Sequence, residues 1–271
     1  MCLLLALLRS VPDAPLIVAA NRDERLARPA VTMTVLRDAG PRILGGRDEL
    51  AGGTWLAVNE DGVVAGLTNQ PAAGGRDATK RSRGELPLAF TAYRSADEAV
   101  AKVTAALDPR EYNPCWLLVG DRERLFSVGL VGGPRPQVRE LPPGLHVLEN
   151  VPLGAPSAKA AQVARQVTAE LAARPSYPGG PAAPDAAADA LAVVLRDHEP
   201  AAGPAGTLPD GRPRPPQLSA ACVHTPDYGT RSALIVTVPA AALPRLQVAD
   251  GRPCEVPFQD ASGLWSRPEL A

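Results

Sequence analysis

The sequence has few cysteines, and their spacing matters more than their number. Cys2, Cys115, Cys222 and Cys254 are scattered over 271 residues without Cys-x-x-Cys spacing. A chain of this length can bury a core without disulfide bridges, and this spacing does not assemble a zinc ligand set. We therefore predict buried thiols at Cys115 and Cys222, no metal site, and a reducing, cytoplasmic location.

Excess charge of one sign is also lacking. The chain has 28 basic and 29 acidic residues, a formal net charge of −1, and no long basic run. Nucleic-acid-binding proteins present concentrated positive charge, so we expect no nucleic-acid partner. Apolar residues make up 45% of the chain, which is enough for a large globular core.

Long apolar runs are missing as well. No window approaches the roughly 18 apolar residues that a membrane-spanning helix needs, so we expect no membrane span. The apolar segment 2–8 ends at Arg9 without a small-residue cleavage site. This segment is therefore expected to be a buried strand and not a signal peptide.

The motifs of three large protein classes are absent. His146, His198 and His224 have neither triad-like nor metal-like spacing. The chain also contains no Gly-x-Ser-x-Gly sequence and no phosphate-binding Gly-Lys-Ser/Thr sequence. The sequence therefore does not support a serine hydrolase, a zinc enzyme or a P-loop nucleotide-binding protein.

Short apolar segments recur along the chain, and these predict strands. The predicted strands cover residues 2–8, 16–20, 42–46, 54–58, 63–68, 116–119, 125–130, 145–148, 220–224, 232–238, 246–249 and 255–258. Ser82 and Ser95 each precede a glutamate by three residues, a spacing that caps helix starts, and Ser157 is expected to cap a helix that ends near residue 173. A further helix is predicted at 186–196.

Strands followed by helices and again by strands predict an α+β fold with few parallel crossovers. We expect a single domain over residues 1–271. The segments 175–184 and 199–216 are rich in proline, glycine and alanine. They are expected to be flexible surface loops inside that domain.

Cysteine at position 2 is the first residue that suggests chemistry. Removal of Met1, which is usual before a small second residue, would leave an amine with a pKa near ~8 and a thiol with a pKa near ~8.5 on one residue. The amine can then accept the thiol proton, so Cys2 would be a nucleophile with its own base. The alternative is a small buried thiol in a core strand.

A polar tetrapeptide, Asn21-Arg22-Asp23-Glu24, directly follows the apolar strand 16–20. In an extended chain, Asn21 and Asp23 point to one face while Arg22 and Glu24 point to the other. A carboxylate beside the N-terminal ammonium favours the charged amine, and Asp23 is the candidate for this role. The alternative is a solvated, charged end of a strand.

Three further polar residues lie at the ends of predicted strands. Asn69 follows the strand 63–68, and Asn150 follows the strand 145–148 after one residue. An asparagine amide can donate a hydrogen bond to the oxyanion of an acyl-transfer intermediate. Arg231 lies between a turn and an apolar strand, where it can bind a carboxylate or organise Cys2. Each of the three is also typical of a turn or a helix cap.

Taken together, these residues resemble the NRDE family, which is named after the tetrapeptide and whose animal members are the second transport-and-Golgi-organisation proteins. The matching segments are residues 1–2, 16–24, 28–29, 43–48, 52–56, 67–69 and 228–232. Their order and combination span the chain from its start to near its end. The matched positions suggest Asn21, Arg22, Glu24, Arg47 and Trp55 as substrate-binding residues.

The NRDE family in turn resembles the N-terminal-nucleophile hydrolases, especially penicillin V acylase and bile-salt hydrolase. This resemblance implies a four-layer αββα sandwich of two mainly antiparallel sheets, with Cys2 at the end of a central strand. Asp23 would match the acidic partner of the N-terminal amine. Asn69, Asn150 and Arg231 would fall near the oxyanion and supporting positions.

The resemblance implies two alternative functions. The first is an N-terminal-cysteine amidohydrolase or acyltransferase that acts on a small amide or acyl substrate, at C–N bonds other than peptide bonds, without a cofactor. The second is a non-enzymatic carrier that binds haem or an acyl lipid in the same cleft, with haem iron held by Cys2 or a histidine. The hydrolases carry an arginine three positions before the acidic residue, where this chain has Ala20. This departure keeps the carrier function open.

Overall fold

The computed structural model describes residues 2–71, 75–175, 182–203, 207–208 and 211–267. Its first sheet contains β1 (Leu3–Val11), β2 (Ala14–Arg25), β10 (Gly144–Leu148), β11 (Tyr228–Val238), β12 (Arg245–Ala249) and β13 (Gln259–Asp260). The strand order is β10-β1-β2-β11-β12-β13, so the two N-terminal strands lie in the interior of this sheet. Neighbouring strands are antiparallel throughout the sheet.

The second sheet is a meander in chain order. It contains β3 (Ala30–Arg37), β4 (Ile43–Asp48), β5 (Leu56–Asn59), β6 (Val64–Asn69), β7 (Cys115–Gly120), β8 (Leu125–Leu130) and β9 (Gln137–Glu140). Each of these strands pairs antiparallel with the next one in sequence. Most connections in this sheet are short and follow from the turn residues between the apolar segments, whereas the connection from β6 to β7 contains two helices.

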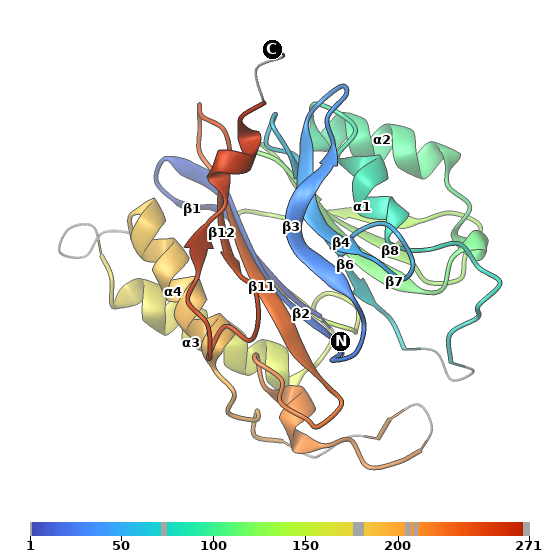
Figure 1. Ribbon diagram of the computed structural model, residues 1–271, viewed down its shortest axis with the longest axis vertical. Coiled ribbons are helices and arrows are strands. Elements are labelled where there is room, and N and C mark those ends of the chain that lie inside the picture. The colour runs from blue at the N-terminus through green and yellow to red at the C-terminus, as the bar shows by residue number, and fades with distance from the viewer. Residues whose placement is uncertain (1, 72–74, 176–181, 204–206, 209–210, 268–271) are drawn as a thin grey trace.

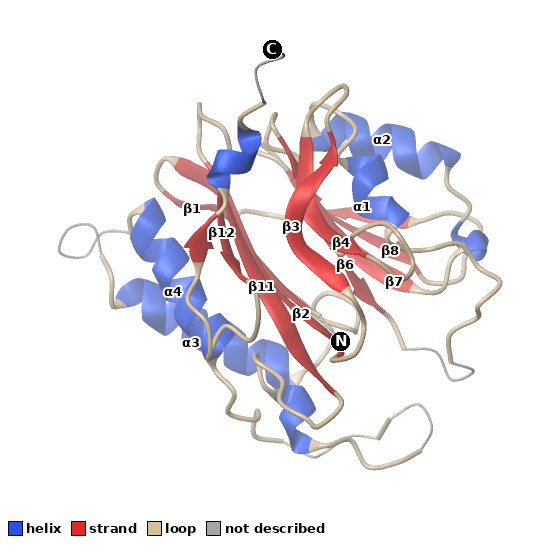
Figure 2. Cartoon of the chain, viewed as in Figure 1, coloured by secondary structure: helices blue, strands red, loops and turns tan. Residues whose placement is uncertain are grey.

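Helices cover the outer face of each sheet, as Figures 1 and 2 show. α1 (Glu85–Phe90) and α2 (Ala96–Ala106) lie on the second sheet, and α3 (Ala158–Ala172) and α4 (Pro184–Arg196) lie on the first. Three short 3₁₀ turns complete the described elements, at Pro109–Glu111, Pro216–Ser219 and Ser262–Trp265. The four layers confirm the predicted αββα sandwich of two mainly antiparallel sheets.

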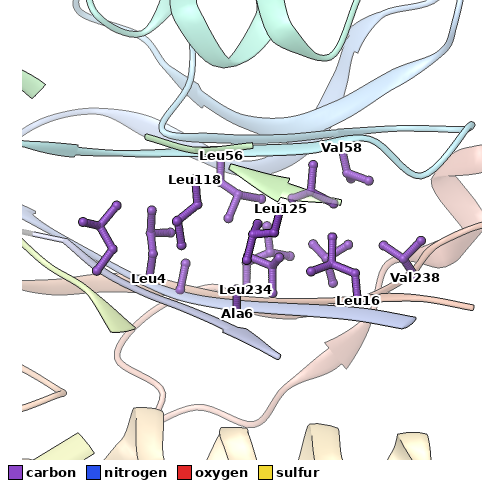
Figure 3. Packing of buried hydrophobic residues seen from close by; sticks show 14 of the residues in the cluster. Leu4, Ala6, Leu16, Leu56, Val58, Leu118, Leu125, Leu234 and Val238 are labelled. Atoms are coloured by element: carbon purple, nitrogen blue, oxygen red, sulfur yellow. The ribbon is translucent and has the colours of Figure 1, made fainter. Parts of the chain in front are cut away.

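Three apolar clusters hold the four layers together. One lies between the sheets, where Leu4 and Leu234 of the first sheet face Leu56 and Leu118 of the second (Figure 3). The other two lie between each sheet and its helices. Alternate residues of β1 enter different clusters, since a strand directs successive side chains to opposite faces. This arrangement explains the unbroken apolar run at the N-terminus, because β1 is buried on both faces.

Local sequence signals located two of the three predicted helix caps. The hydroxyls of Ser95 and Ser157 accept hydrogen bonds from the backbone N–H groups of Glu98 and Ala160, so both of these helix starts are confirmed. The cap predicted at Ser82 is wrong. α1 begins only at Glu85, and the Ser82 hydroxyl accepts a hydrogen bond from Gly84 N at 3.3 Å without capping the helix.

The strand predictions failed mainly at the sheet edges and near the end of the chain. β3 was missed because it follows Pro29 and is only half-buried, and β9 was missed because all four of its residues are exposed. Residues 220–224 and 255–258 are not strands. The first of these segments is instead held against the end of α4 by a hydrogen bond from Cys222 N to Asp197 O at 2.7 Å.

The two loops predicted at 175–184 and 199–216 lie partly outside the described residues. The described part of the loop predicted at 175–184 ends where α4 begins, at Pro184. Among the described residues, no helix has the length and apolar character that crossing a membrane requires.

Candidate active site

The end of β2 presents polar side chains to two different layers, as its alternation predicts. Asn21 and Asp23 point to the helices behind the first sheet. The Asn21 amide donates to Leu195 O of α4 at 2.9 Å and to Ala221 O at 2.8 Å. Arg22 points the opposite way, toward the second sheet, and its Nη2 lies 3.0 Å from Asp48 Oδ2 at the end of β4. The sequence-based assignment of the two faces is therefore confirmed for these three residues.

Cys2 lies at the mouth of a cavity between the two sheets. It directly precedes β1, and because Leu3 pairs with Asn21, Cys2 lies next to Arg22 across the strand pair. The cavity has a volume of about 750 Å³, and its walls come from the end of β2, the β4–β5 connection, the end of β6 and the segment before α1. Cys2 is half-buried in this wall, so its thiol faces a space large enough for a small ligand.

The Cys2 thiol is held mainly in its neutral form. Burial raises the pKa of Cys2, and the negative charge of Asp23 raises it further. The positive charge of the chain's N-terminus, the backbone N–H of Asp23 and the guanidinium of Arg22 lower the pKa of Cys2, because all three favour the thiolate. Cys2 therefore needs an additional base or positive charge to act as a nucleophile near neutral pH.

Asp23 is buried among partners on the helical side of β2. Its Oδ1 accepts a hydrogen bond from the Thr230 hydroxyl of β11 at 2.6 Å, and its Oδ2 lies 3.7 Å from the Lys159 ammonium of α3. Burial raises the pKa of Asp23, although the positive charge of Lys159 opposes the shift. Neither Thr230 nor Lys159 was suggested by the sequence, because helix position and strand register decide which residues reach Asp23.

Arg22 and Asp48 anchor a second polar group on the cavity side. Arg28 donates two hydrogen bonds to Asp48, at 2.7 and 3.0 Å, in addition to the contact from Arg22. Burial disfavours the ionised form of Asp48, but the hydrogen bonds from Arg28 and the Ala51 amide hold its pKa below the usual value. Asp48 and Arg28 were not predicted as site residues.

Trp55 forms the floor beneath this ion group. The Arg22 guanidinium lies 4.4 Å from the centroid of a Trp55 ring, a cation–π contact. Gly46 makes room for the indole, because a Cβ at this position would lie 2.1 Å from two of its ring atoms. The glycine pair at 45–46 therefore serves close packing beside the cavity. Trp55 and Glu24 line the cavity, and their role in substrate binding stays a prediction.

Asn69 and Asn150 come together at the ends of β6 and β10. The Asn150 amide donates a hydrogen bond to Asn69 O, and this contact joins the two sheets. Asn69 lines the Cys2 cavity, whereas Asn150 lines a larger neighbouring cavity of about 1280 Å³ that also contains Lys159. Asn69 is therefore placed to contact a ligand beside Cys2, and Asn150 is placed to orient Asn69.

Three residues expected at the site lie elsewhere. The Arg231 guanidinium donates to the backbone carbonyls of Arg25, Leu26 and Arg28, so it holds the turn after β2 and does not line the cavity. Arg47 is exposed and donates to Val35 O at 3.1 Å, and Asn21 is committed to the helical layer. A one-residue shift in register beside Arg231 explains its orientation, and sequence alone gave no sign of it.

Arginines dominate the cavity wall. The lining contains six arginines and three carboxylates, and the described histidines are not among its residues. Arg83 donates to Pro114 O at 3.1 Å, and among the described residues no carboxylate lies within ion-pair distance of it. Burial lowers the pKa of Arg83, and the charges of Arg76 and Arg28 lower it further. The excess of arginine in the composition gave no hint that several would converge here.

Comparisons with known proteins agree with this architecture. The family model for Transport and Golgi organisation 2 matches residues 1–244. The Transport and Golgi organization protein 2 homolog of Bos taurus is 32% identical over 246 residues, which cover 83% of this chain and 82% of the bovine protein. The resemblance inferred from the NRDE tetrapeptide and the accompanying segments is confirmed.

Two solved structures show the same fold at low sequence identity. Penicillin V acylase from Agrobacterium tumefaciens aligns with a TM-score of 0.51 and 13% identity, over 92% of this chain and 83% of the acylase. A Caenorhabditis elegans N-acylethanolamine-hydrolyzing acid amidase ortholog aligns with a TM-score of 0.53 and 11% identity, over 87% of this chain and 92% of the amidase. The fold is therefore that of the N-terminal-nucleophile hydrolases.

Proposed function

The chain belongs to the Transport and Golgi organisation 2 family, and we propose that it is an N-terminal-cysteine amidohydrolase or acyltransferase. Its substrate would be a small amide or acyl compound, and the bond would be a C–N bond other than a peptide bond. One observation carries the proposal. The Cys2 thiol lines a ligand-sized cavity at the start of a central strand, next to Asp23 and Asn69. Similarity to an acylase and an amidase supports the same reaction class.

Removal of Met1 precedes the reaction and converts the backbone nitrogen of Cys2 into a free amine. This amine takes the proton of the thiol, and the resulting ammonium stabilises the thiolate against the effect of burial. The buried carboxyl group of Asp23 orients the ammonium. Because the Cys2 amine supplies both the base and the positive charge, the raised pKa of the unprocessed thiol does not prevent catalysis.

The thiolate then attacks the substrate carbonyl carbon, and the carbonyl π electrons move to oxygen. The Asn69 amide is the candidate donor to this oxyanion, with Asn150 holding the Asn69 backbone in place. Collapse of the intermediate breaks the C–N bond, and the leaving amine takes the proton from the ammonium of Cys2. Water or a second acyl acceptor then attacks the thioester, which returns a proton to Cys2 and releases the acyl group.

The arginine-rich wall supports a substrate with an anionic group. Arg83 is half-buried, and it lines the cavity together with Cys2 and other arginines. A bound carboxylate would pair with Arg83 and offset the repulsion between these positive charges. The preferred substrates would then be N-acyl amino acids or similar anionic amides. Neutral N-acyl amines with the same acyl chain would bind more weakly, because they leave the arginines without a counter-charge.

The test is a turnover assay with a panel of N-acyl amino acids and N-acyl ethanolamines of matched chain length. The intact mass of the protein is measured first, to establish that Met1 has been removed. Cys2→Ala is expected to lower turnover by at least about a thousandfold, and the anionic substrates are expected to react faster. Cys115→Ala is the matched control, because Cys115 is a buried thiol on β7 outside the cavity. Turnover that survives Cys2→Ala contradicts the proposal.

The second candidate is a carrier that binds haem or an acyl lipid in the same cavity. The arginines favour it, because they would pair with haem propionates or with a fatty-acid carboxylate. Among the described residues lining the cavity, Cys2 is the candidate axial ligand for haem iron. A saturable Soret band that is lost in Cys2→Ala, in a protein without amide turnover, would favour the carrier. The absence of a specific band would exclude haem as its ligand.

A further inference from the structure

Four side chains that are distant in sequence meet on the outer side of the first sheet. His198 follows α4, Cys222 and His224 precede β11, and Cys254 lies in the connection after β12. The linear spacing of these residues suggested no metal ligand set, and their proximity is a feature of the tertiary structure alone. Three separate loops bring two thiols and two imidazoles to one place. None of these four side chains lines the Cys2 cavity.

The distances within the group are close to those of a tetrahedral metal centre. The two sulfurs of Cys222 and Cys254 lie 3.7 Å apart, and His224 Nε2 lies 3.5 Å from Cys222 Sγ and 3.1 Å from Cys254 Sγ. The bond lengths of zinc to sulfur and nitrogen imply about 3.8 Å between two bound sulfurs and about 3.6 Å between a sulfur and a nitrogen. Three ligand atoms are therefore already arranged around a common centre.

His198 is in position to be the fourth ligand. Its ring nitrogen lies within 4.8 Å of the ligand atoms of His224 and Cys254. Cys222 is not in this group of mutually close ligand atoms, so the exposed His198 side chain has to turn toward the two thiols to complete the site. The other three ligands are buried or half-buried, as expected for a centre that closes against the protein.

From this geometry we propose that Cys222, His224, Cys254 and His198 bind one zinc ion. Two thiolates neutralise the charge of the ion, and thiolate with imidazole ligands selects zinc over magnesium or calcium. Binding releases the thiol protons, since thiolates are the ligands. The proposal of a zinc site does not depend on the proposed reaction at Cys2.

The zinc ion would have a structural role, because the segment that holds two of its ligands supports the end of β2. Ala221 O accepts a hydrogen bond from the Asn21 amide at 2.8 Å, and Val223 N donates to the Thr230 hydroxyl at 2.8 Å. The same hydroxyl donates to Asp23. Zinc would therefore add a cross-link to a segment that hydrogen bonds and the burial of Ala221 already hold against the sheet, and it would support the position of Asp23 through Thr230.

The experiment uses the full chain, purified under reducing conditions, stripped with a chelator and titrated with cobalt(II). We expect one equivalent to produce the visible d–d absorption of tetrahedral cobalt and a thiolate-to-cobalt charge-transfer band, both removed by zinc. Cys222→Ser and Cys254→Ser should each weaken binding by at least about a hundredfold, since each removes a ligand. His198→Ala should weaken binding less and keep the two-thiolate band, because water can replace an exposed imidazole.

Cys115→Ser is the matched control, since this buried thiol lies on the second sheet, and it should leave the cobalt spectrum unchanged. The wild-type titration keeps the test decisive even if a ligand variant fails to fold. Absence of the charge-transfer band in reduced wild-type protein overturns the proposal. It is overturned equally by cobalt binding that survives both cysteine substitutions, or by a Cys222–Cys254 disulfide that forms in preference to metal binding under reducing conditions.

Discussion

Strand β2 separates two polar groups that balance their charges differently. On the helical side, Asp23 Oδ2 lies 3.7 Å from the ammonium of Lys159, and both side chains are buried. On the cavity side, Asp48 accepts hydrogen bonds from Arg22 and Arg28 at 2.7 to 3.0 Å and remains partly exposed. The pKa of Asp23 is raised, whereas the pKa of Asp48 is lowered.

The difference shows that the number and geometry of donors decide the outcome more than the presence of an opposite charge. Hydrogen bonds from the Arg28 guanidinium and the Ala51 amide, with the charge of Arg22, outweigh the effect of burial on the pKa of Asp48. The charge of Lys159 and the hydrogen bond from Thr230 do not outweigh the effect of deeper burial on the pKa of Asp23. The two faces therefore suit different tasks. The cavity face holds a stable ion group beside Trp55, and the helical face holds a carboxyl group that can respond to a nearby ammonium.

The largest expected effect comes from removing the Lys159 ammonium beside Asp23. Lys159→Met should lower the free energy of unfolding by about 3 kcal/mol, because it removes a buried positive charge from beside the buried carboxyl group of Asp23. Urea denaturation at neutral pH measures the change. Lys102→Met is the control, since Lys102 lies exposed on α2 and should change stability by less than about 0.5 kcal/mol. An equally small effect of Lys159→Met would mean that Asp23 is already protonated or otherwise satisfied.

A smaller effect is expected on the cavity face. Asp48→Asn should lower the free energy of unfolding by about 2 kcal/mol, because it replaces a charged acceptor of three arginine hydrogen bonds by a neutral one. The cost is lower than for Lys159→Met, since Asp48 and Arg28 are partly open to water. Asp13→Asn, on an exposed turn whose positive φ asparagine tolerates, is the matched control. A loss above that of Lys159→Met would reverse the order of the two faces.

The smallest effect is the pH dependence of stability, and its sign differs between the faces. The folded-state pKa of Asp48 is lowered. Its contribution to the free energy of unfolding is therefore present above the unfolded-state pKa of about 3.9, and it is lost as the pH falls through the folded-state pKa. The folded-state pKa of Asp23 is raised, so its contribution is present below the unfolded pKa and is lost as the pH rises through the folded value.

Urea denaturation of the wild type, Asp48→Asn and Asp23→Asn from about pH 3 to pH 8 tests these signs. Asp48→Asn should reduce the decrease in the free energy of unfolding at the acidic end of the range. Asp23→Asn should reduce the decrease that occurs as the pH rises above the unfolded-state pKa of an aspartate. The change assigned to Asp48 should stay below about 1 kcal/mol, because water and salt screen a partly exposed pair. Two substitutions that flatten the same side of the curve would contradict the comparison.

The elements that the sequence predicted well are those with strong local signals. β1, β2, β7 and β8 carry long buried apolar runs, and the hydroxyls at Ser95 and Ser157 cap helices within their own first turn. Exposed edge strands such as β9 lack this signal, because pairing on one side alone holds them.

In the candidate site, too, local strand geometry predicted some features and tertiary packing decided the others. Alternation along β2 was enough to assign Asn21 and Asp23 to one face and Arg22 to the other, since strand geometry imposes it. Arg231 was expected near Cys2, but a register shift in β11 turns it toward the turn after β2. Asp48, Lys159 and Thr230 could not be found from the sequence, because their positions depend on which strands and helices pack together.

By itself, the sequence determined the family, the layered α+β fold and the two faces of the NRDE tetrapeptide. These features rest on local patterns and on an ordered set of motifs along the chain. Only the tertiary structure decided that Arg83 borders the Cys2 cavity, that Lys159 reaches Asp23, and that Cys222 and Cys254 lie 3.7 Å apart. The physical reason is that ion pairs and hydrogen bonds act over a few ångströms between residues far apart in sequence, and packing of the layers sets those distances.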